Sequence, residues 1–403
     1  MFWKRGKVVL EGKNILVGVT GSIAIYKTLE LIRAYIKAGA NVKVLMSEEA
    51  KKFITPLCFE AISQNEVLSV ESESWSNSNN HIYIGKWADI FVIAPISANS
   101  LNKIANGLAD NLLTSTVLAY NKKIILAPAA NTNMILNPIT LESIKKLQAL
   151  GFIFAHPQEK LLACNDKGIG AMSEPNDIYE LTVRELTCKE FWLDKEVIIT
   201  GGGTIEKIDD VRCLSNFSSG KMANALAKAF YYAGAKVTLI TSAQTFFPKE
   251  NLQIKHFQST NQLAQLIQEE LSQNKKYLFM AAAISDYIPT KQETGKLKKS
   301  QLGETWTLEL KQNTDILASL KDTNLIKIGF KAEIDSQNAL QNAQNMLKDK
   351  ELDAVCLNIL EAENNFGSDK NKVTFLTKQS TKELPLSYKE DIAAQILKLS
   401  ESL

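Results

Sequence analysis

The sequence contains few cysteines and histidines, and those it has are scattered. Its 403 residues include five cysteines and three histidines. An odd cysteine count without a CxxC pair argues against a disulfide framework and against a structural zinc site. The chain must therefore fold on an apolar core, and a sequence of this length can bury most of its apolar surface without such cross-links.

Neither an excess of one charge nor a long apolar run is present. Forty-six basic residues oppose 44 acidic ones, a net charge of +2, which gives no indication of a nucleic-acid partner or an anionic membrane. No apolar run approaches the roughly 18 residues of a membrane span, and the N-terminal MFWKRGKVVLEGKN has too short an apolar stretch for a signal peptide. With 45% hydrophobic and 22% charged residues, the composition is typical of a globular protein, and we expect a cytoplasmic enzyme.

The chain contains the same local pattern twice. NILVGVT, GSIAIYKTLELIRAYIKAGA and NVKVLMS are matched later by EVIITGGGT, SSGKMANALAKAFYYAGA and KVTLITS. Each set predicts a buried strand, a glycine-rich turn, a helix and a second parallel strand. Further apolar runs, such as DIFVIAP and KIILAPA in the first half and YLFMAAA and DAVCLNI in the second, alternate with helical patterns. We therefore predict two doubly wound, mainly parallel-sheet, Rossmann-like α/β domains in tandem, residues 1–188 and 189–403.

The two glycine turns, Gly18 to Lys27 and Thr200 to Thr204, favour phosphate binding, because each would expose N–H groups at a helix N-terminus. Neither matches GxGxxG or a P-loop. The strand ending at Thr241–Ser242 supplies no acid for a ribose hydroxyl, which weakens a plain NAD site. A tight turn that only packs helix on strand is the alternative.

Longer motifs carry a more specific resemblance. GSIAIYK, HIYIGKWADIFVIAPISAN, APAANTNM and LLACNDKGIGAM resemble the flavin-dependent phosphopantothenoylcysteine decarboxylases. ITGGGTIEKIDDVRCLSNFSSGKMANALA, AAAISDYIPTKQETGKLKK and NNFGSDKNKV resemble the phosphopantothenate–cysteine ligases. Their order is similar to that of the bifunctional coenzyme A biosynthesis proteins, and the resemblance covers nearly the whole chain.

The resemblance to the decarboxylases implies an FMN cofactor that serves as the electron sink for loss of CO₂. It assigns His81 as the base, Asn131 as the ligand of the substrate carboxylate, and Cys164, on a mobile flap, as the proton donor. The residues expected to bind FMN lie at strand ends: Gly21, Ser22, Ser47, Ser97 and Asn99. A turn-capping role for Asn131 and a buried, inert Cys164 are the alternatives; His156 and His256 are expected to be structural.

The resemblance to the ligases implies activation of 4′-phosphopantothenate by CTP, with Mg²⁺ held largely by the nucleotide phosphates, and then attack by L-cysteine on the acyl-cytidylate. It assigns Asn216 to the second step, with capping of the following helix as the alternative. Lys296, with Lys298 and Lys299, is expected in a mobile lid over the phosphates. The expected CTP-binding residues are Asp286, Lys296, Asn313, Thr314, Asp315, Ile316, Phe330 and Lys350.

Three positions depart from the family pattern. Ala130 stands where the family usually has Met, Ala171 where it has Arg, and Met346 where a partner lysine to Lys350 is expected, a cation that Lys348 would then supply. The resemblance also implies a homo-oligomer that combines decarboxylase trimers with ligase dimers. A flavin-dependent decarboxylase of peptidyl cysteine, a non-enzymatic flavoprotein and a two-domain NAD(P) dehydrogenase are the alternative functions.

Overall fold

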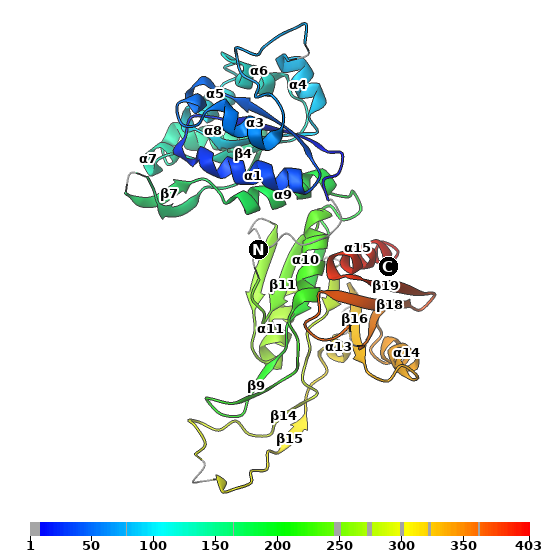
Figure 1. Ribbon diagram of the computed structural model, residues 1–403. Coiled ribbons are helices and arrows are strands. Elements are labelled where there is room, and N and C mark those ends of the chain that lie inside the picture. Colours follow the sequence, from blue (N-terminus) through cyan, green and yellow to red (C-terminus); the bar gives the residue numbers. More distant parts are fainter. Residues whose placement is uncertain are drawn as a thin grey trace. The chain divides into compact units, whose positions relative to one another are not determined.

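The computed structural model of the protein describes residues 9–77, 79–163, 165–245, 251–271, 276–298, 302–320, 324–361 and 363–403. The chain divides into two compact units, which meet in the sequence between Thr187 and Cys188 (Figure 1). Both are α/β units with mainly parallel sheets. The predicted fold class is therefore confirmed.

The first unit is built on a five-stranded sheet in the order β2-β1-β3-β4-β5, and every neighbouring pair is parallel. All seven residues of β3 are buried, as expected of a strand covered on both faces. This strand order is the flavodoxin-like one, in which the chain reverses direction across the sheet between β1 and β3. The strands are β1 (Asn14–Val19), β2 (Asn41–Met46), β3 (Ile90–Ile96), β4 (Ile124–Pro128) and β5 (Ile153–Phe154).

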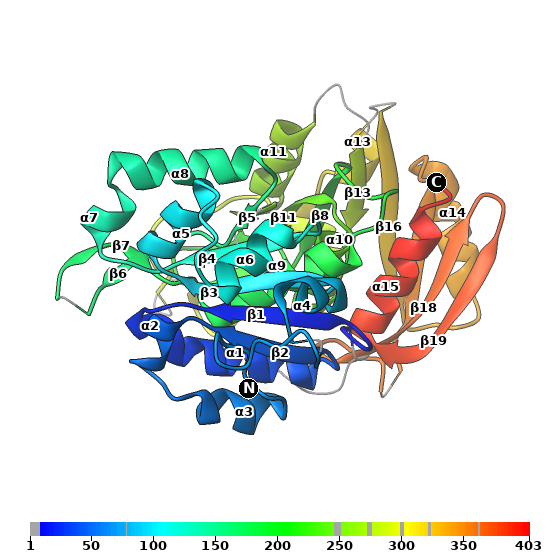
Figure 2. The same cartoon turned by 90° about the horizontal axis from the view of Figure 1, so that it is seen from above.

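Helices cover both faces of this sheet (Figures 1 and 2). Helices α1, α3 and α9 pack together on one face, and α4, α5, α6 and α8 on the other. The helical segments are η1 (Ile23–Ile25), α1 (Tyr26–Lys37), α2 (Glu48–Lys51), α3 (Pro56–Ser63), α4 (His81–Trp87), α5 (Ala98–Ala105), α6 (Leu112–Ala119), α7 (Thr132–Ile135), α8 (Pro138–Ala149) and α9 (Pro175–Thr187). A separate antiparallel hairpin, β6 (Gln158–Leu161) with β7 (Lys167–Ala171), contains the predicted flap.

The second unit has an eight-stranded sheet in the order β12-β11-β8-β13-β16-β17-β18-β19. Its first six strands are parallel and follow the order of dinucleotide-binding domains, with the reversal between β8 and β13. An antiparallel hairpin extends the β17 edge. The strands are β8 (Glu196–Gly201), β11 (Lys236–Thr241), β12 (Leu252–His256), β13 (Lys276–Met280), β16 (Leu325–Glu333), β17 (Ala354–Ile359), β18 (Lys370–Thr377) and β19 (Thr381–Tyr388).

Two apolar clusters fill the faces of this sheet. One gathers around Trp192 and Phe230 beneath α10 (Lys221–Tyr232) and α15 (Lys389–Ser400). The other lies beneath α11 (Thr260–Glu270), α13 (Ile316–Ser319) and α14 (Ala339–Asp349). Trp192 is fully buried, and its indole N–H donates a hydrogen bond to Glu401 at 3.1 Å, which ties the end of the chain to the start of this unit.

Two short antiparallel ladders stand apart from the main sheet of the second unit (Figure 1). One pairs β9 (Ile205–Lys207) with β10 (Cys213–Ser215), and the other pairs β14 (Tyr287–Pro289) with β15 (Leu310–Gln312). They follow the turns after β8 and β13, so each extends a loop from the point where the sheet reverses direction. The predicted ligase motifs lie mostly in these loops.

Candidate functional sites

The turns after β1 and β3 are hydrogen-bonded to each other. Thr20 is buried, and its hydroxyl donates to the Pro95 carbonyl at 2.9 Å and accepts from the Ser97 N–H at 2.8 Å. This joins the predicted flavin residues Gly21 and Ser22, after β1, to Ser97, after β3. The N–H of Ser47, after β2, donates to the Val19 carbonyl at 3.0 Å. Four of the predicted flavin residues therefore lie along one carboxyl edge of the sheet.

Each of the three serines caps a helical segment. The hydroxyls of Ser22, Ser47 and Ser97 accept from N–H groups in the first turns of η1, α2 and α5, at 3.4, 3.4 and 3.3 Å. The N-termini of these helical segments thus lie at the carboxyl edge of the sheet. Their N–H groups would suit an anion there. Gly21 is required for packing, because a Cβ there would lie 2.8 Å from Cβ of Glu49.

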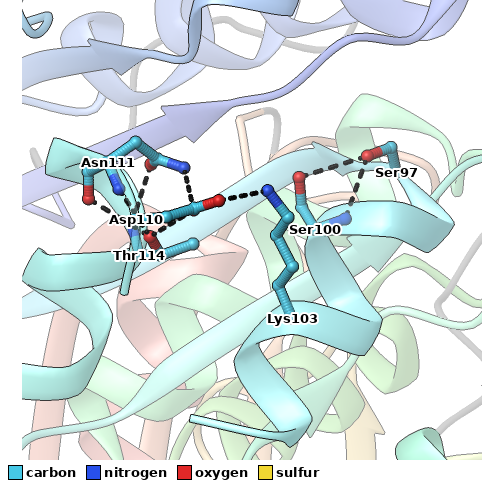
Figure 3. A network of polar contacts seen from close by, with 6 residues as sticks. All are labelled: Ser97, Ser100, Lys103, Asp110, Asn111 and Thr114. Atoms are coloured by element: carbon cyan, nitrogen blue, oxygen red, sulfur yellow. Dashed lines mark hydrogen bonds and ion pairs between the residues drawn. The ribbon is translucent and has the colours of Figure 1, made fainter. Parts of the chain in front are cut away.

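A polar network fixes the segment that follows Ser97 (Figure 3). Lys103 of α5 is paired with Asp110 ahead of α6, and Asn111 and Thr114 form a reciprocal capping box at the start of α6. The predicted flavin residue Asn99 lies in the first turn of α5 and is exposed. The ion pair of Lys103 with Asp110 thus ties the loop between α5 and α6 to α5.

His81, the predicted base, is the first residue of α4. The preceding Asn80 is fully buried, and its side-chain oxygen accepts from the N–H groups of Ile82 and Tyr83, both at 3.1 Å. His81 Nδ1 lies 3.3 Å from a carboxylate oxygen of Glu73, and its ring meets Trp75 edge-on with centroids 5.7 Å apart. These contacts fix the ring through Nδ1, and this contact pattern suits a base that acts through the other nitrogen.

Asn131 and the hairpin β6–β7 lie together. Asn131 precedes α7, and its side-chain oxygen accepts from the Asn133 N–H at 2.9 Å, so the capping role is confirmed. The Ala130 N–H donates to the Gly170 carbonyl in β7 at 3.1 Å. Cys164, which lies between β6 and β7 in the sequence, is outside the described residues. Ala130, a departure from the family pattern, is thus the point where the hairpin attaches by its backbone.

Gly170 has no room for a side chain: a Cβ there would lie 2.1 Å from the Ala130 carbonyl oxygen. Gly170→Ala should therefore push the hairpin away from Asn131 and lower decarboxylase kcat/KM at least about tenfold, because a backbone atom cannot move aside as a flexible side chain can. Steady-state decarboxylation assays would measure the loss of kcat/KM, and the thermal unfolding temperature would report the loss of packing.

Gly85→Ala is the matched control. It lies inside α4, its Cβ would make only an ordinary contact with Tyr120 at 3.6 Å, and helix propensity favours alanine by about 0.5–1 kcal/mol. We expect its unfolding temperature to be unchanged or raised. A Gly170→Ala variant with the stability and rate of the parent would contradict the tight packing of the hairpin.

In the second unit, the turns after β8 and β13 are joined in the same manner. The Thr204 N–H donates to the Ala283 carbonyl at 3.1 Å, and the buried Thr204 hydroxyl accepts from the Ser285 N–H at 3.2 Å. Gly201 lets α10 approach, since a Cβ there would lie 2.3 Å from Cβ of Ala223. The Ala283 N–H donates to the carbonyl of Gly202 at 2.8 Å.

Asn216 extends from the loop before α10 to the loop after β13. Its side-chain N–H donates to the Ile284 carbonyl at 2.9 Å. A Cβ on Gly203 would lie 2.6 Å from the Asn216 carbonyl oxygen, so the third glycine of the turn makes room for this loop. The capping alternative for Asn216 is wrong, because the N-cap of α10 is Gly220 in a left-handed conformation with φ of 68°.

Asn313 is held in the same region. Its side-chain N–H donates to the Ser285 carbonyl at 2.8 Å and to the Thr260 hydroxyl at 2.9 Å, and its backbone N–H donates to the Asp286 carbonyl at 2.8 Å. The Thr260 hydroxyl in turn donates to Glu206 at 2.6 Å. The Asp286 side chain is exposed. The structure therefore brings Asn216, Asp286 and Asn313 around one pair of loops.

The rest of the predicted CTP set is spread over α13, α14 and β16. Asp315 caps α13 and pairs with Lys350 at 2.7 Å. Partial burial alone would raise the pKa of Asp315, but hydrogen bonds from Lys350 and the Ala318 N–H bring it below its usual value. Thr314 is exposed, the Ile316 side chain is buried in the core, and Phe330 lies half-buried in β16.

Met346 is a packing residue. A Cβ on Gly329 would lie 2.8 Å from the end of the Met346 side chain, which packs against the cluster beneath α14. Lys348, predicted as a substitute cation, is exposed on α14. Lys296 is also exposed, and Lys299 lies outside the described residues.

The described ranges contain no group of three or more His, Cys, Asp or Glu side chains placed to hold a metal ion. In the same ranges, no helix combines the length and apolar character needed to cross a membrane.

Sequence reasoning missed several residues that support these sites. Glu73 and Trp75 beside His81 lie in a loop without periodicity, and no spacing rule points to them. Thr20 and Thr204 lie within the two predicted glycine turns, but the part their hydroxyls play in joining neighbouring strand ends was not predicted.

Comparisons with known proteins follow this division. The family model described as "Flavoprotein" matches residues 5–187, and that of the DNA/pantothenate metabolism flavoprotein C-terminal domain matches residues 192–403. The chain thus joins a flavoprotein to a pantothenate-metabolism domain.

Curated relatives match over nearly their full length. The coenzyme A biosynthesis bifunctional protein CoaBC of Borreliella burgdorferi is 36% identical over 96% of this chain and 99% of its own. That of Haemophilus influenzae is 37% identical, over 96% and 97%. The chain belongs to the family of coenzyme A biosynthesis bifunctional proteins, which confirms the resemblance inferred from its motifs. It is accordingly a flavoprotein enzyme of coenzyme A biosynthesis, with a decarboxylase and a ligase activity.

Two solved structures resemble separate parts of the chain. The C-terminal domain of a coenzyme A biosynthesis bifunctional protein CoaBC is 29% identical, covers 53% of this chain and 97% of its own, and has a TM-score of 0.44. A PPC decarboxylase mutant complexed with pantothenoylaminoethenethiol is 36% identical, covers 42% and 96%, and has a TM-score of 0.39.

Proposed function

We propose that the second sheet joins 4′-phosphopantothenate to L-cysteine at the expense of CTP, and that the first sheet decarboxylates the product to 4′-phosphopantetheine with FMN. The observation that carries the proposal is the strand order. Gly21, Ser22 and Ser97 in the first unit, and Asp286 in the second, follow the strands between which the sheet reverses direction, and open α/β sheets bind ligands at such points. We also propose residues 1–188 and 189–403 as the two catalytic domains.

The first edge suits FMN. Gly21, Ser22, Ser47 and Ser97 would hold the phosphate and ribityl hydroxyls, because their helix starts and hydroxyls form a donor set for an anion and a polyol. Asn99 is the further predicted contact. When bound, FMN supplies the electron sink that loss of CO₂ from the cysteine carboxylate requires.

The chain supplies orientation and proton transfer to the same reaction. His81, held through Nδ1 by Glu73, would take the proton at its Nε2 atom. Asn131, half-buried beside the hairpin, would donate its side-chain N–H to the substrate carboxylate. Cys164, between β6 and β7 in the sequence, would return a proton. Without the family arginine at Ala171, the hairpin would hold an anionic substrate by fewer charged contacts.

The ligase reaction has two steps. A carboxylate oxygen of 4′-phosphopantothenate attacks the α-phosphorus of CTP and pyrophosphate leaves; the cysteine amine then attacks the acyl carbon and CMP leaves. Lys296 and Lys350 would neutralise the phosphates, and Asn216 would hold the acyl-cytidylate for its second step. Asp286 and the segment Asn313–Ile316, with Phe330, would form the cytidine pocket.

Three further features belong to this proposal. Mg²⁺ would enter bound to the phosphates of CTP, which are hard oxygen ligands that this ion prefers. The protein would act in the cytoplasm. It would assemble as a homo-oligomer that combines decarboxylase trimers and ligase dimers.

The proposal is tested on the purified full chain with 4′-phosphopantothenate and L-cysteine. We expect a yellow protein, pyrophosphate release with CTP and Mg²⁺ well above that with ATP, GTP or UTP, and CO₂ release that requires the first product. Protein that carries no flavin and cannot be loaded with FMN would refute the first half. Equal rates with all nucleotides would refute the CTP assignment, and faster CO₂ release from a peptide ending in cysteine would refute the substrate.

A further inference from the structure

The backbone on both sides of Lys296 is anchored to a loop between β9 and β10. Asp210 accepts a hydrogen bond from the Gly295 N–H at 2.7 Å, and its own N–H donates to the Gly295 carbonyl at 3.2 Å. Asp209 Oδ2 accepts from the Leu297 N–H at 3.2 Å. The exposed Lys296 is thus the one residue between two fixed neighbours.

Asp209 is the centre of this arrangement. Its Oδ1 accepts from the N–H groups of Val211 and Arg212, at 2.8 and 2.7 Å, and its Oδ2 accepts from Arg212 Nε at 3.0 Å and from Nη2 at 2.5 Å. Arg212 Nη2 also donates to the Leu297 carbonyl at 3.0 Å. One carboxylate therefore fixes its own turn, the arginine and the segment that carries Lys296.

The arginine also contacts the far side of the same loop. Its guanidinium lies 4.8 Å from the ring centroid of Trp306, which follows Lys296 in the long connection between β14 and β15. Arg212 is therefore held between Asp209 and an aromatic face, and a movement of Asp209 would affect the positions of both Leu297 and Trp306.

The Asp209 carboxylate is built to stay ionised. Asp209 is 1% exposed. Hydrogen bonds from the Arg212 side chain and from the N–H groups of Val211 and Leu297 hold the pKa of its carboxyl well below the usual range. Because the folded pKa is lowered, these hydrogen bonds persist through neutral and mildly acidic pH and are lost only as the pH falls through the folded value.

We propose that Asp209 is a positioning residue for Lys296: it fixes the backbone at Leu297 directly and through Arg212, so that the Lys296 ammonium is held over the nucleotide phosphates. This rests on the proposed function, in which Lys296 binds those phosphates. Asp209, which is buried, would itself contact none of the ligase substrates. Its effect should therefore depend on the presence of Lys296.

The test compares Asp209→Asn, Lys296→Gln and the double variant in the full-length enzyme. Asparagine can keep the Oδ1 acceptor, but its NH₂ group would face the three donors that Oδ2 now accepts from. We expect ligase kcat/KM for CTP to fall about tenfold to a hundredfold, the loss that follows from hydrogen bonds to a charged group, mainly through KM. The double variant should be only slightly worse than Lys296→Gln alone, since coupled residues are not additive.

Asp194→Asn is the matched control, because Asp194 pairs with Lys236 at the start of the same unit and makes no recorded contact with the Lys296 segment in the described ranges. It should keep the ligase kinetics of the parent. Trypsin should cleave after Lys296 faster in Asp209→Asn than in Asp194→Asn. Decarboxylation of supplied 4′-phosphopantothenoyl-L-cysteine should be equal in all variants.

The outcomes separate the two claims. If Lys296→Gln keeps full ligase activity, the proposed role of Lys296 is wrong. If Lys296→Gln is impaired while Asp209→Asn has the parent's KM and cleavage rate, or if the two losses multiply in the double variant, the positioning role of Asp209 is overturned.

Discussion

Replacing His81 with asparagine is expected to slow decarboxylation by about 10²–10⁴-fold, the usual contribution of a general base. Pyrophosphate release from CTP should continue at the parent rate, because His81 belongs to the first unit. Asparagine keeps a polar group near Glu73 but cannot take the proton. Separate assays of CO₂ and pyrophosphate on the same preparation would measure the two effects.

His156→Asn is the control for this experiment. His156 is exposed and its ring stacks on Phe154, with centroids 6.3 Å apart, at the end of β5. It should retain decarboxylation within about threefold, because no proton transfer is assigned to it. The separation of sites would be wrong if folded His81→Asn protein lost both activities, and the base assignment would be wrong if it kept both.

The second large effect is expected from Asn216→Asp. The Asn216 side chain donates to the Ile284 carbonyl, whereas a carboxylate at this position has no proton to donate and repels that oxygen. The added charge would also lie beside the phosphate of the intermediate. We expect acyl-cytidylate to form and accumulate, giving a burst of about one pyrophosphate per site and amide formation reduced by at least about 10²-fold.

Rapid-quench assays of pyrophosphate and amide, with and without L-cysteine, would detect this behaviour. Asn345→Asp is the control, since Asn345 is exposed on α14 and accepts a hydrogen bond from Gln341 that a carboxylate can also accept. Normal amide formation by Asn216→Asp, or absence of the burst in folded protein, would contradict the assignment to the second step.

The parallel strands could be predicted because the signal for each of them lies within its own sequence. A strand buried on both faces needs an uninterrupted apolar run, and the runs around Val17, Val92 and Ile199 have that form. The glycine turns were equally visible, because each precedes a helical pattern. Both sheets follow from these elements.

The antiparallel additions could not be predicted in the same way. β6 has three exposed residues out of four, and β15 is exposed throughout, so neither has an apolar pattern. Their pairing is set by backbone fit, as at Gly170 against Ala130. β18 does alternate between exposed and buried residues, but only its neighbour β17 makes it the continuation of a larger sheet.

The sequence predicted which residues belong to the candidate sites, but it did not predict the contacts that those residues make. The serines after β1, β2 and β3 and the asparagine of SNFSSGK were found from their motifs. Their partners were not, because a hydrogen bond such as that from Asn216 to Ile284 joins residues 68 apart in the sequence. Asp209 and Arg212, an acid and a base three positions apart, left a visible pattern, but one that is usual on any exposed turn.

The Thr20 hydroxyl has a thermodynamic consequence. It donates to the Pro95 carbonyl and accepts from the Ser97 N–H, so hydrogen bonds within the protein tie the turn after β1 to the turn after β3. A flavin that binds at this edge would meet turns already tied to each other, and its binding would cost little conformational entropy there. Affinity for the flavin should accordingly reside in contacts to the cofactor and only slightly in the ordering of the crevice.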